Sequence, residues 1–128
     1  MKPKTNIAVD FSIIIPAYNE QNYIGAVLDR LSNAIAEIKN LTGEVIVVDN
    51  NCSDQTAILA KEKGARVVFE PINQISRARN AGACVARGKY LFFVDADTQI
   101  SNELLLLSLQ RLEGGECGGG GSTVVFDS

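Results

Sequence analysis

The sequence contains no histidine and no tryptophan, and acidic residues outnumber basic ones. It has 15 Asp and Glu against 12 Lys and Arg, a formal net charge of -3. Without histidine, Ser–His and Cys–His triads and histidine-ligated metal sites are excluded within this chain, so a metal ion would need oxygen ligands. The acidic balance argues against a nucleic-acid partner, because binding to a phosphate backbone usually needs a clustered basic surface.

Cysteine and long hydrophobic runs are also scarce. Cys52, Cys84 and Cys117 are odd in number and include no C-x-x-C pair, which is typical of reduced cytoplasmic thiols rather than a disulfide framework. Residues 1–10 lack the apolar core of a signal peptide. The longest apolar runs, such as Leu104–Leu107, are far below the roughly 20 residues that span a bilayer. We therefore expect a cytoplasmic location and no transmembrane segment.

The length and composition predict one folded domain over residues 1–128. Hydrophobic residues make up 46% of the chain and charged residues 21%, as in ordinary globular proteins and unlike disordered chains. A chain of this length can bury most of its apolar surface around one core.

Strands and helices are expected to alternate along the chain. Short β-branched or apolar runs predict strands, and apolar residues spaced by three or four predict helices. The predicted strands are 11–15 (closed by Pro16), 44–49, 66–69, 90–94 and 122–126, and the predicted helices are 20–39, 55–63, 75–87 and 101–112. This alternation predicts an α/β fold with a doubly wound, mostly parallel sheet.

Local signals mark several helix ends. Ser53 and Asp54 are expected to cap the second helix, Gly64 to follow it in a left-handed conformation, and Gly88 to end the third helix. The glycine-rich stretch 114–121 follows a helix, which favours a flexible connector over a phosphate-binding loop.

Polar residues gather where three predicted strands end. The first strand leads into residues 16–20 (PAYNE), the second into 49–54 (DNNCSD) and the fourth into 95–97 (DAD). In open parallel sheets the ligand crevice lies beyond the carboxyl ends of the strands, near the point where strand order reverses. We therefore expect these three segments to meet at one rim.

Asp95 and Asp97 are candidate metal ligands. Mg²⁺ and Mn²⁺ take oxygen ligands, usually one or two carboxylates together with substrate phosphates and water. An isolated D-x-D pattern more often only caps a turn, but its position beside the other two strand ends favours a site for a metal and a diphosphate.

Other residues at this rim have both a binding and a structural interpretation. Asp49 could accept hydrogen bonds from a base or ribose, or could be a turn residue. Tyr18 could stack on a base or be a loop aromatic. Arg77 and Arg79 could meet phosphate or base oxygens, and one of them is expected to be only a solvated helix charge. Cys52 is expected to be a small loop thiol, because no histidine could activate it.

In order and spacing, these segments resemble the family 2 glycosyltransferases of the GT-A fold over nearly all of residues 11–128. Residues 12–20 (SIIIPAYNE) resemble the family's opening strand and loop, and 44–56 (EVIVVDNNCSDQT) its second strand with a D-[DN]-x-S-x-D-x-T turn. Residues 78–82 (ARNAG) and 86–97 (ARGKYLFFVDAD) resemble its A-R-N-x-G helix and D-x-D strand. Each element alone is a weak signal, whereas the ordered set is specific.

The resemblance implies a Rossmann-like fold of the nucleotide-diphospho-sugar transferases and a UDP- or GDP-sugar donor. Asp49 would hold the base, and Asp95 would approach both ribose and metal. Asp97 would ligate a divalent Mn²⁺ or Mg²⁺ bridging the diphosphate, and Gln99 would join the metal shell, as the glutamine does in members whose motif reads D-A-D-x-Q. The other residues implied to line the nucleotide pocket are Pro16, Ala17, Tyr18, Glu20 and the Ala96 of the D-A-D motif.

The chain departs from the family pattern in two ways. Asn50 stands where many members have a second aspartate. A complete member also continues well beyond this length, and the catalytic base of an inverting enzyme is expected in that later segment. We therefore interpret the chain as a truncated, nucleotide-sugar-binding half that lacks the acceptor-binding half, and the catalytic residue is unknown.

Two kinds of alternative stay open at this point. The chain could be a non-catalytic nucleotide-binding fragment, or a structural module whose sheet edge with Val124 and Val125 favours a homodimer. A signalling receiver domain would need an aspartate after the third strand and a lysine after the fifth, where this chain has Glu70 and Asp127. A nucleotidyltransferase would need a glycine- and lysine-rich loop after the first strand, which is absent.

Overall fold

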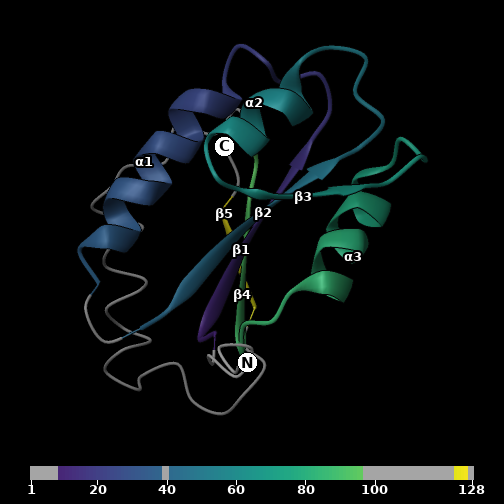
Figure 1. The fold of residues 1–128 in the computed structure, drawn as a ribbon. Coiled ribbons are helices and arrows are strands. Elements are labelled where there is room, and N and C mark those ends of the chain that lie inside the picture. The colour runs from purple at the N-terminus through teal and green to yellow at the C-terminus, as the bar shows by residue number, and fades with distance from the viewer. Residues whose placement is uncertain (1–8, 39–40, 97–122, 127–128) are drawn as a thin grey trace, which may run out of the picture.

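The structure is a computed structural model that describes residues 9–38, 41–96 and 123–126 (Figure 1). Strands and helices alternate in the first part of the chain, as the sequence predicts. The elements are β1 (Phe11–Ala17), α1 (Ile24–Ala36), β2 (Gly43–Asp49), α2 (Thr56–Glu62), β3 (Arg66–Phe69), α3 (Ile75–Val85), β4 (Tyr90–Val94) and β5 (Thr123–Phe126). The predicted helix 101–112 and the glycine-rich stretch lie outside the described residues.

The five strands form one sheet in the order β3-β2-β1-β4-β5. Every neighbouring pair is parallel. The chain therefore winds outward from β1 to β3 and then returns to the other side of β1, so the order reverses between β1 and β4. This confirms the predicted doubly wound parallel sheet.

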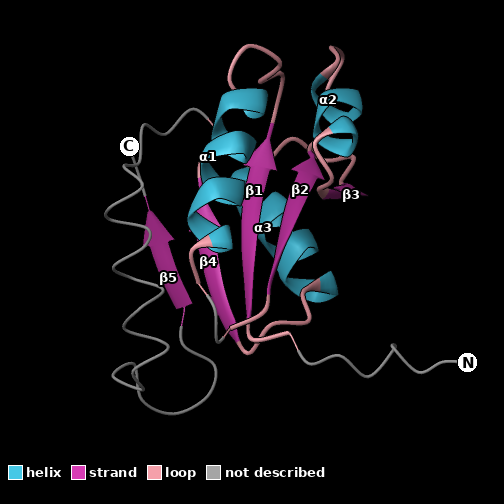
Figure 2. Ribbon diagram, turned by 60° about the vertical axis from the view of Figure 1, so that its left-hand side comes forward, coloured by secondary structure: helices cyan, strands magenta, loops and turns pink. Residues whose placement is uncertain are grey.

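The helices cover both faces of this sheet and divide the core in two (Figure 2). On one face, α1 packs through Leu28 and Leu31 against side chains such as Ile13 and Ile15 of β1. On the other face, Ala78 of α3 joins a smaller cluster with Ile14, Ile46 and Val48. All seven residues of β1 are buried, which is expected for a parallel strand with helices on both faces.

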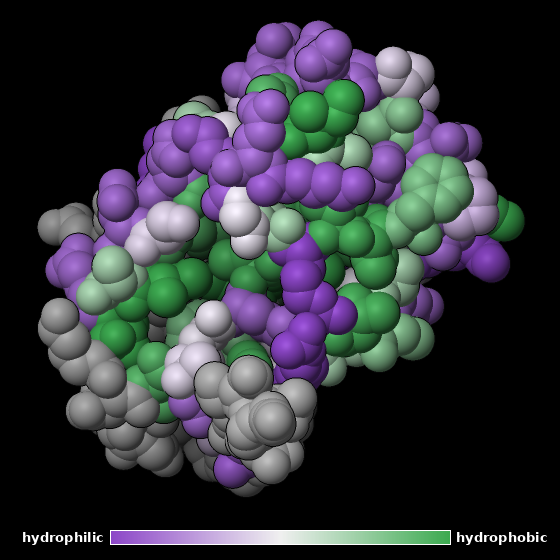
Figure 3. Space-filling view, in the orientation of Figure 1, coloured by the Kyte–Doolittle hydropathy of each residue, from purple (hydrophilic) through white to green (hydrophobic). Residues whose placement is uncertain are grey.

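The β3 edge of the sheet is less completely covered than its centre. Val67 and Val68 are half-buried, and Phe69 is exposed. On the face seen in Figure 3, hydrophobic side chains lie on both sides of a column of hydrophilic ones, and further hydrophilic side chains lie above them.

β1 is longer than predicted, because Pro16 does not close it. The strand runs to Ala17, and Pro16 pairs in register with Val48 of β2. Pairing with β4 has already ended at Ile14. Proline has no N–H to donate and is tolerated where a strand is paired on one side only. The predicted end at Ile15 was therefore two residues too early.

All three described helices are shorter than predicted, and for α1 and α3 the contacts of the neighbouring loops explain the difference. α1 begins at Ile24 instead of residue 20, since the preceding segment is bonded to the turn after β2. α3 ends at Val85, and Ala86 is already extended. Gly88 therefore does not end the helix: a Cβ there would lie 2.4 Å from the backbone carbon of Phe11, so glycine is needed for a close approach to β1.

The predicted signals at the ends of α2 are partly confirmed. Gly64 has φ +90° and follows the helix, and Ala65 N–H donates to the Ala60 carbonyl at 3.1 Å, as expected for a left-handed C-terminal cap. At the other end Asp54 accepts the Thr56 N–H at 2.9 Å. Gln55 holds the N-cap position, and the Ser53 hydroxyl does not cap the helix but donates to Asn19 Oδ1 at 3.4 Å.

A carboxylate joins four segments at the amino ends of the strands. Glu44 accepts hydrogen bonds from the Ser12 hydroxyl at 2.6 Å, the Arg87 N–H at 2.7 Å and the Arg66 guanidinium at 2.8 Å. The same Ser12 hydroxyl oxygen accepts the Gly88 N–H. Burial raises the pKa of Glu44, but these three hydrogen bonds outweigh it, so the pKa lies below its ordinary value of 4.5.

Two further observations concern the cysteines and the helices of the described residues. Cys52 and Cys84 are free thiols, whereas Cys117 lies outside the described ranges. Within those ranges, none of the helices combines the length and the apolar character needed to cross a bilayer.

Gly82→Ala is predicted to destabilise the fold by about 1–3 kcal/mol, because a Cβ would lie 2.4 Å from Ile14 Cγ2 where α3 packs on the sheet. Urea unfolding measures the change. Gly25→Ala in α1 is the matched control, since its Cβ would make only an ordinary contact of 3.7 Å with Lys63. The control should be neutral or slightly stabilising. Equal losses in both variants would contradict the close packing of α3.

Glu44→Gln is predicted to cost about 1–3 kcal/mol at pH 7, because the amide nitrogen must face one of the three donors. The folded-state pKa of Glu44 is lowered, so the stabilisation by its carboxylate is present above pH 4.5 and is lost as the pH falls through the folded-state pKa. Urea unfolding at several pH values should therefore show that the free energies of unfolding of the wild type and the variant become equal in acid. A difference that is constant with pH would refute the role of the charge. Exposed Glu62→Gln is the control.

Candidate functional site

The carboxyl ends of β1, β2 and β4 lie at one edge of the sheet. β1 pairs in parallel with both β2 and β4, so the segments that follow the three strands emerge side by side. The strand order reverses between β1 and β4. Ligands of open α/β sheets bind at such a reversal. A binding site is therefore expected at this edge.

A pocket of about 240 Å³ opens at this edge. Its walls come from the ends of β1, β2 and β4 and from the first turns of α3. Seven of the residues predicted for the site line it, namely Pro16, Ala17, Tyr18, Glu20, Arg79, Asp95 and Ala96, together with Asn50 and Ile75. The structure thus brings together residues as far apart in the sequence as Pro16 and Ala96.

Arg79 and Asp95 face each other on the wall of this pocket. The guanidinium Nη2 lies 3.9 Å from Asp95 Oδ1, and each side chain is about one third exposed, at 33% and 31%. The guanidinium carbon also lies 5.9 Å from the centre of the Phe93 ring. A cation and a carboxylate held together at a cavity wall can meet both an anionic ligand and its counter-ion.

Two predicted residues lie outside this pocket. Asp49 Oδ1 accepts the Cys52 N–H at 2.8 Å and so takes part in the turn after β2. Arg77 lies 3.5 Å from Glu70 in an ion pair, with its side chain 52% exposed, and it lines a different surface hollow. Of the two arginines, Arg79 is therefore the one at the pocket.

Asn50 and Ile75 line the pocket but were not among the predicted residues. Strand alternation could have identified Asn50: Ile46 and Val48 of β2 belong to the cluster beneath α3, and Asn50 continues the same alternate positions beyond the strand. By the same rule Asp49 faces the other way. Ile75 opens α3 with its side chain exposed, and its sequence carries no comparable signal.

A second hollow adjoins the pocket on the side of the segment between β3 and α3. It measures about 310 Å³ and shares Tyr18, Asn50 and Ile75 with the first. Asn73 and Gln74 complete its lining. Because three residues belong to both hollows, the two form a continuous surface with an apolar part around Tyr18 and Ile75.

The loop after β1 is bonded to the turn after β2 by a set of hydrogen bonds that we call the latch, formed by Asn19, Glu20, Gln21, Cys52, Ser53, Asp54 and Thr56. The Glu20 N–H donates to Thr56 Oγ1 at 2.9 Å, and the Gln21 N–H to Asp54 at 3.2 Å. In the other direction, the Ser53 N–H donates to Asn19 at 2.8 Å. The latch therefore fixes the backbone on both sides of Tyr18 and Glu20.

Cys52 belongs to the latch and stands where the motif has serine. Its thiol donates to the Ala17 carbonyl at 3.3 Å and accepts the Asn19 N–H at 3.3 Å. Burial raises the pKa of the Cys52 thiol, and the neighbouring Asp49 carboxylate raises it further. The thiol thus stays protonated and acts as a structural hydrogen-bonding group, in line with the expected loop thiol.

The predicted metal ligands are only partly within the described residues. Asp95 lines the pocket, whereas Asp97 and Gln99 lie outside the described ranges. In those ranges, acidic, cysteine and histidine side chains nowhere form a group of three that could hold a metal ion. The Asp95 carboxylate at the pocket is compatible with Mg²⁺ or Mn²⁺, which take a carboxylate or two beside phosphates and water.

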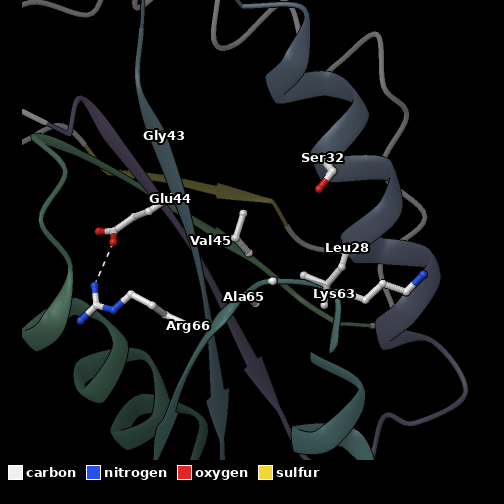
Figure 4. Close-up of a pocket in the computed structure, with 9 residues that line it drawn as sticks. Leu28, Ser32, Gly43, Glu44, Val45, Lys63, Ala65 and Arg66 are labelled. Carbon is white, nitrogen blue, oxygen red and sulfur yellow. Dashed lines mark hydrogen bonds and ion pairs between the residues drawn. The ribbon is translucent and has the colours of Figure 1, made fainter. Parts of the chain in front are cut away.

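The larger cavity of about 320 Å³ lies at the opposite edge, where β2 and β3 begin (Figure 4). Glu44 and Arg66 point toward each other on one side of β2, while Leu28, Ser32 and Lys63 lie on the other. Glu44 is already bonded to Arg66, and Lys63 to Asp29. Its main charged groups are thus engaged in the fold, so the smaller pocket is the better candidate.

Similar proteins were found among curated sequences. Over 101 residues the chain is 34% identical to an uncharacterized glycosyltransferase of Haemophilus influenzae, covering 73% of this chain and 38% of that protein. Over 75 residues it is 35% identical to an uncharacterized glycosyltransferase of Rickettsia bellii, covering 59% of this chain and 26% of that protein. The chain thus spans between about a quarter and two fifths of the length of these relatives.

Solved structures share the fold. Glucosyl-3-phosphoglycerate synthase from Mycobacterium tuberculosis, crystallised with Mn²⁺, uridine diphosphate and glucosyl-3-phosphoglycerate, superimposes with a TM-score of 0.66 at 26% identity, covering 81% of this chain and 39% of that chain. S. aureus TarS 1-349 in complex with UDP-GlcNAc gives a TM-score of 0.69 at 29% identity, covering 84% and 32%. These neighbours confirm the GT-A architecture expected from the sequence.

The family assignment comes from a match over most of the chain. The model of the family described as glycosyl transferase family 2 matches residues 12–125. The match includes all three strand ends that build the pocket. The chain therefore belongs to glycosyl transferase family 2.

Proposed function

We propose that the pocket binds a nucleoside-diphosphate sugar and that the chain is the donor-binding part of a glycosyltransferase. The main support is the pocket at the reversal of strand order, where Tyr18, Asn50, Arg79 and Asp95 meet. An aromatic ring, an amide, a guanidinium and a carboxylate are the groups that such a ligand needs. The structural neighbours crystallised with uridine diphosphate or UDP-GlcNAc add support.

The base and ribose would lie on the part of the pocket around Tyr18. Tyr18 and Ile75 are 53% and 54% exposed, so both offer apolar surface to a base. Asn50, instead of the predicted Asp49, would face the nucleoside, because Asn50 lines both hollows and Asp49 lines neither. Of the UDP and GDP donors expected from the sequence, UDP is preferred, since it is the nucleotide of the neighbours.

The diphosphate would lie between Arg79 and the Asp95 side of the pocket. Asp95, with Asp97 and Gln99, would hold a divalent cation, for which Mn²⁺ is suggested by the Mycobacterium tuberculosis synthase. A bound cation supplies charge neutralisation of the leaving diphosphate. Asp95 would position the cation, and Arg79 would hold the phosphates in place.

Inverting transfer to an acceptor remains part of this proposal for the whole protein, and the catalytic base stays unassigned. The cytoplasmic location, the lack of a nucleic-acid partner and the homodimer also stay predictions. β5 is an end strand of the sheet, the place at which pairing with a second copy was expected.

Asp97→Ala is predicted to abolish Mn²⁺-dependent binding of uridine diphosphate, and Asp95→Asn to weaken it at least tenfold, about 1.4 kcal/mol. Each change removes a carboxylate from the proposed metal site. Titration calorimetry with UDP and GDP, with and without Mn²⁺, measures the effect. Asp29→Asn is the matched control. Asp29 is exposed, forms an ion pair with Lys63 and does not line the pocket. A folded wild-type chain that binds no nucleoside diphosphate would refute the proposal.

A binding module without catalysis makes the same binding prediction. An activity assay distinguishes the two proposals. The purified chain is incubated with a UDP-sugar and Mn²⁺, and the release of uridine diphosphate is measured. Sugar transfer or hydrolysis above the rate of the Asp97→Ala variant would rule out the non-catalytic module. Tight binding without release would favour it for this part of the protein.

Thr56→Val is predicted to weaken both the fold and nucleotide binding. The change keeps the shape but leaves the Glu20 N–H without its acceptor, which costs about 1–3 kcal/mol in a buried position. Because the latch holds the backbone around Tyr18, affinity for uridine diphosphate should fall as well. Urea unfolding and calorimetry measure the two effects. Exposed Thr42→Val should change neither, and unchanged affinity in the Thr56 variant would show that the latch does not position the pocket.

A further inference from the structure

Asn50 bonds the end of β2 to the segment between β3 and α3. Its side-chain Nδ2 donates two hydrogen bonds, to the Glu70 carbonyl at 3.0 Å and to the Ile72 carbonyl at 2.6 Å. The residue is only 6% exposed. The backbone adds a third link, since the Glu70 N–H donates to the Asp49 carbonyl at 2.9 Å. In Figure 1 this segment, residues 70–74, is the loop that projects at the right of the view between β3 and α3.

Two neighbouring asparagines repeat the same chemistry. Asn73 Nδ2 donates back to the Asn50 carbonyl, and Asn51 Nδ2 donates to the Pro71 carbonyl at 3.3 Å. Asn51 has φ +62°, a conformation that asparagine tolerates better than most residues. We call Asn50, Asn51 and Asn73 the asparagine clamp. All of its side-chain bonds are donated by an amide to a backbone carbonyl.

An amide is needed in this clamp, because an ionised carboxylate can only accept hydrogen bonds. An aspartate at position 50 would place charged oxygens against the carbonyl oxygens of Glu70 and Ile72. In a nearly buried position, the lost bonds and the repulsion would both favour release of the segment. This chain therefore could not keep the same loop contacts with the aspartate that is common in the sequence motif.

The segment held by the clamp forms part of the pocket wall. It leads directly into Ile75, the first residue of α3, and Asn73, Gln74 and Ile75 line the hollow that Asn50 also lines. Arg79 follows one turn later on the same helix and lines the adjoining pocket. The clamp thus holds the start of α3 near the end of β2. Residues of both elements line the pocket.

We propose that Asn50 is a positioning residue of the nucleotide pocket, which through its amide holds residues 70–74 and the start of α3 against the end of β2. The nucleotide part of this inference rests on the proposed function. The positioning part concerns the fold of the ligand-free chain and can be tested separately.

A test must distinguish the loss of the Asn50 hydrogen bonds from the effect of an added charge, because other charged groups lie near position 50. Asp49 and Glu70 belong to the clamped segments, and the charged residues of the pocket itself are Glu20, Arg79 and Asp95. Asn50→Asp removes the donors and adds a negative charge, whereas Asn50→Ala removes the donors alone. Asn33→Asp is the matched control, since Asn33 is exposed on α1.

The first measurement is hydrogen exchange of the ligand-free chain. Protection factors of the amides in residues 70–74 should fall about tenfold or more in Asn50→Asp and Asn50→Ala, while those of α1 stay as in the wild type. Lowering the pH should restore part of the protection in Asn50→Asp only, because a protonated carboxyl can donate one hydrogen bond. Unchanged protection in both variants, or equal recovery in Asn50→Ala, would overturn the proposal.

The second measurement is calorimetry with uridine diphosphate and Mn²⁺. Both Asn50 variants should bind at least about tenfold more weakly than the wild type, and Asn33→Asp should bind as the wild type does. If the Asn50 variants do not fold, Asn73→Ala removes one exposed donor and should lower protection of residues 70–74 in the same direction. Wild-type affinity in a folded Asn50→Asp chain would overturn the proposal. If the wild type binds no nucleotide, the proposed function and the nucleotide role fail together, while exchange still decides whether Asn50 holds the segment.

Discussion

The parallel pairing of β1 with β2 on one side and β4 on the other organises the sheet and the pocket. It buries all seven residues of β1 and makes β1 and β4 the neighbours between which strand order reverses. The segments after β1, β2 and β4 must then leave the sheet at the same edge. The pocket exists because backbone pairing brings Tyr18, Asn50 and Asp95 to one place.

Backbone pairing stops at the strand ends. Beyond them, side-chain hydrogen bonds hold the loops in place. Asp54 and Thr56 hold the loop after β1, and the asparagine clamp holds the segment before α3. Both sets supply partners for backbone groups that no ladder satisfies. At the other edge Glu44 has the equivalent role for the strand beginnings. The polar residues of the motif thus serve the loop geometry as much as any ligand.

Membership of glycosyl transferase family 2 and the position of the pocket lead to one proposal, donor binding at the edge beside Arg79 and Asp95. Some polar residues of the sequence motif form hydrogen bonds within the loops and do not line the pocket. Asp49 accepts a backbone N–H in its own turn, and Cys52 takes a hydrogen-bonding position between two loops. What the pocket offers a ligand is instead an amide, a guanidinium and the carboxylates of Glu20 and Asp95.

The alternation of strands and helices, the parallel sheet and most of the pocket residues could be predicted from the amino acids alone, because buried β-branched runs and strand-end motifs are local signals. It misplaced the ends of β1, α1 and α3, where Pro16, the latch and Gly88 depend on distant partners. That Asn50 and Arg79 line the pocket, whereas Asp49 and Arg77 do not, became visible once the elements were packed together. Which side chain of a neighbouring pair faces a site depends on strand alternation and helix rotation relative to the sheet, and packing fixes both.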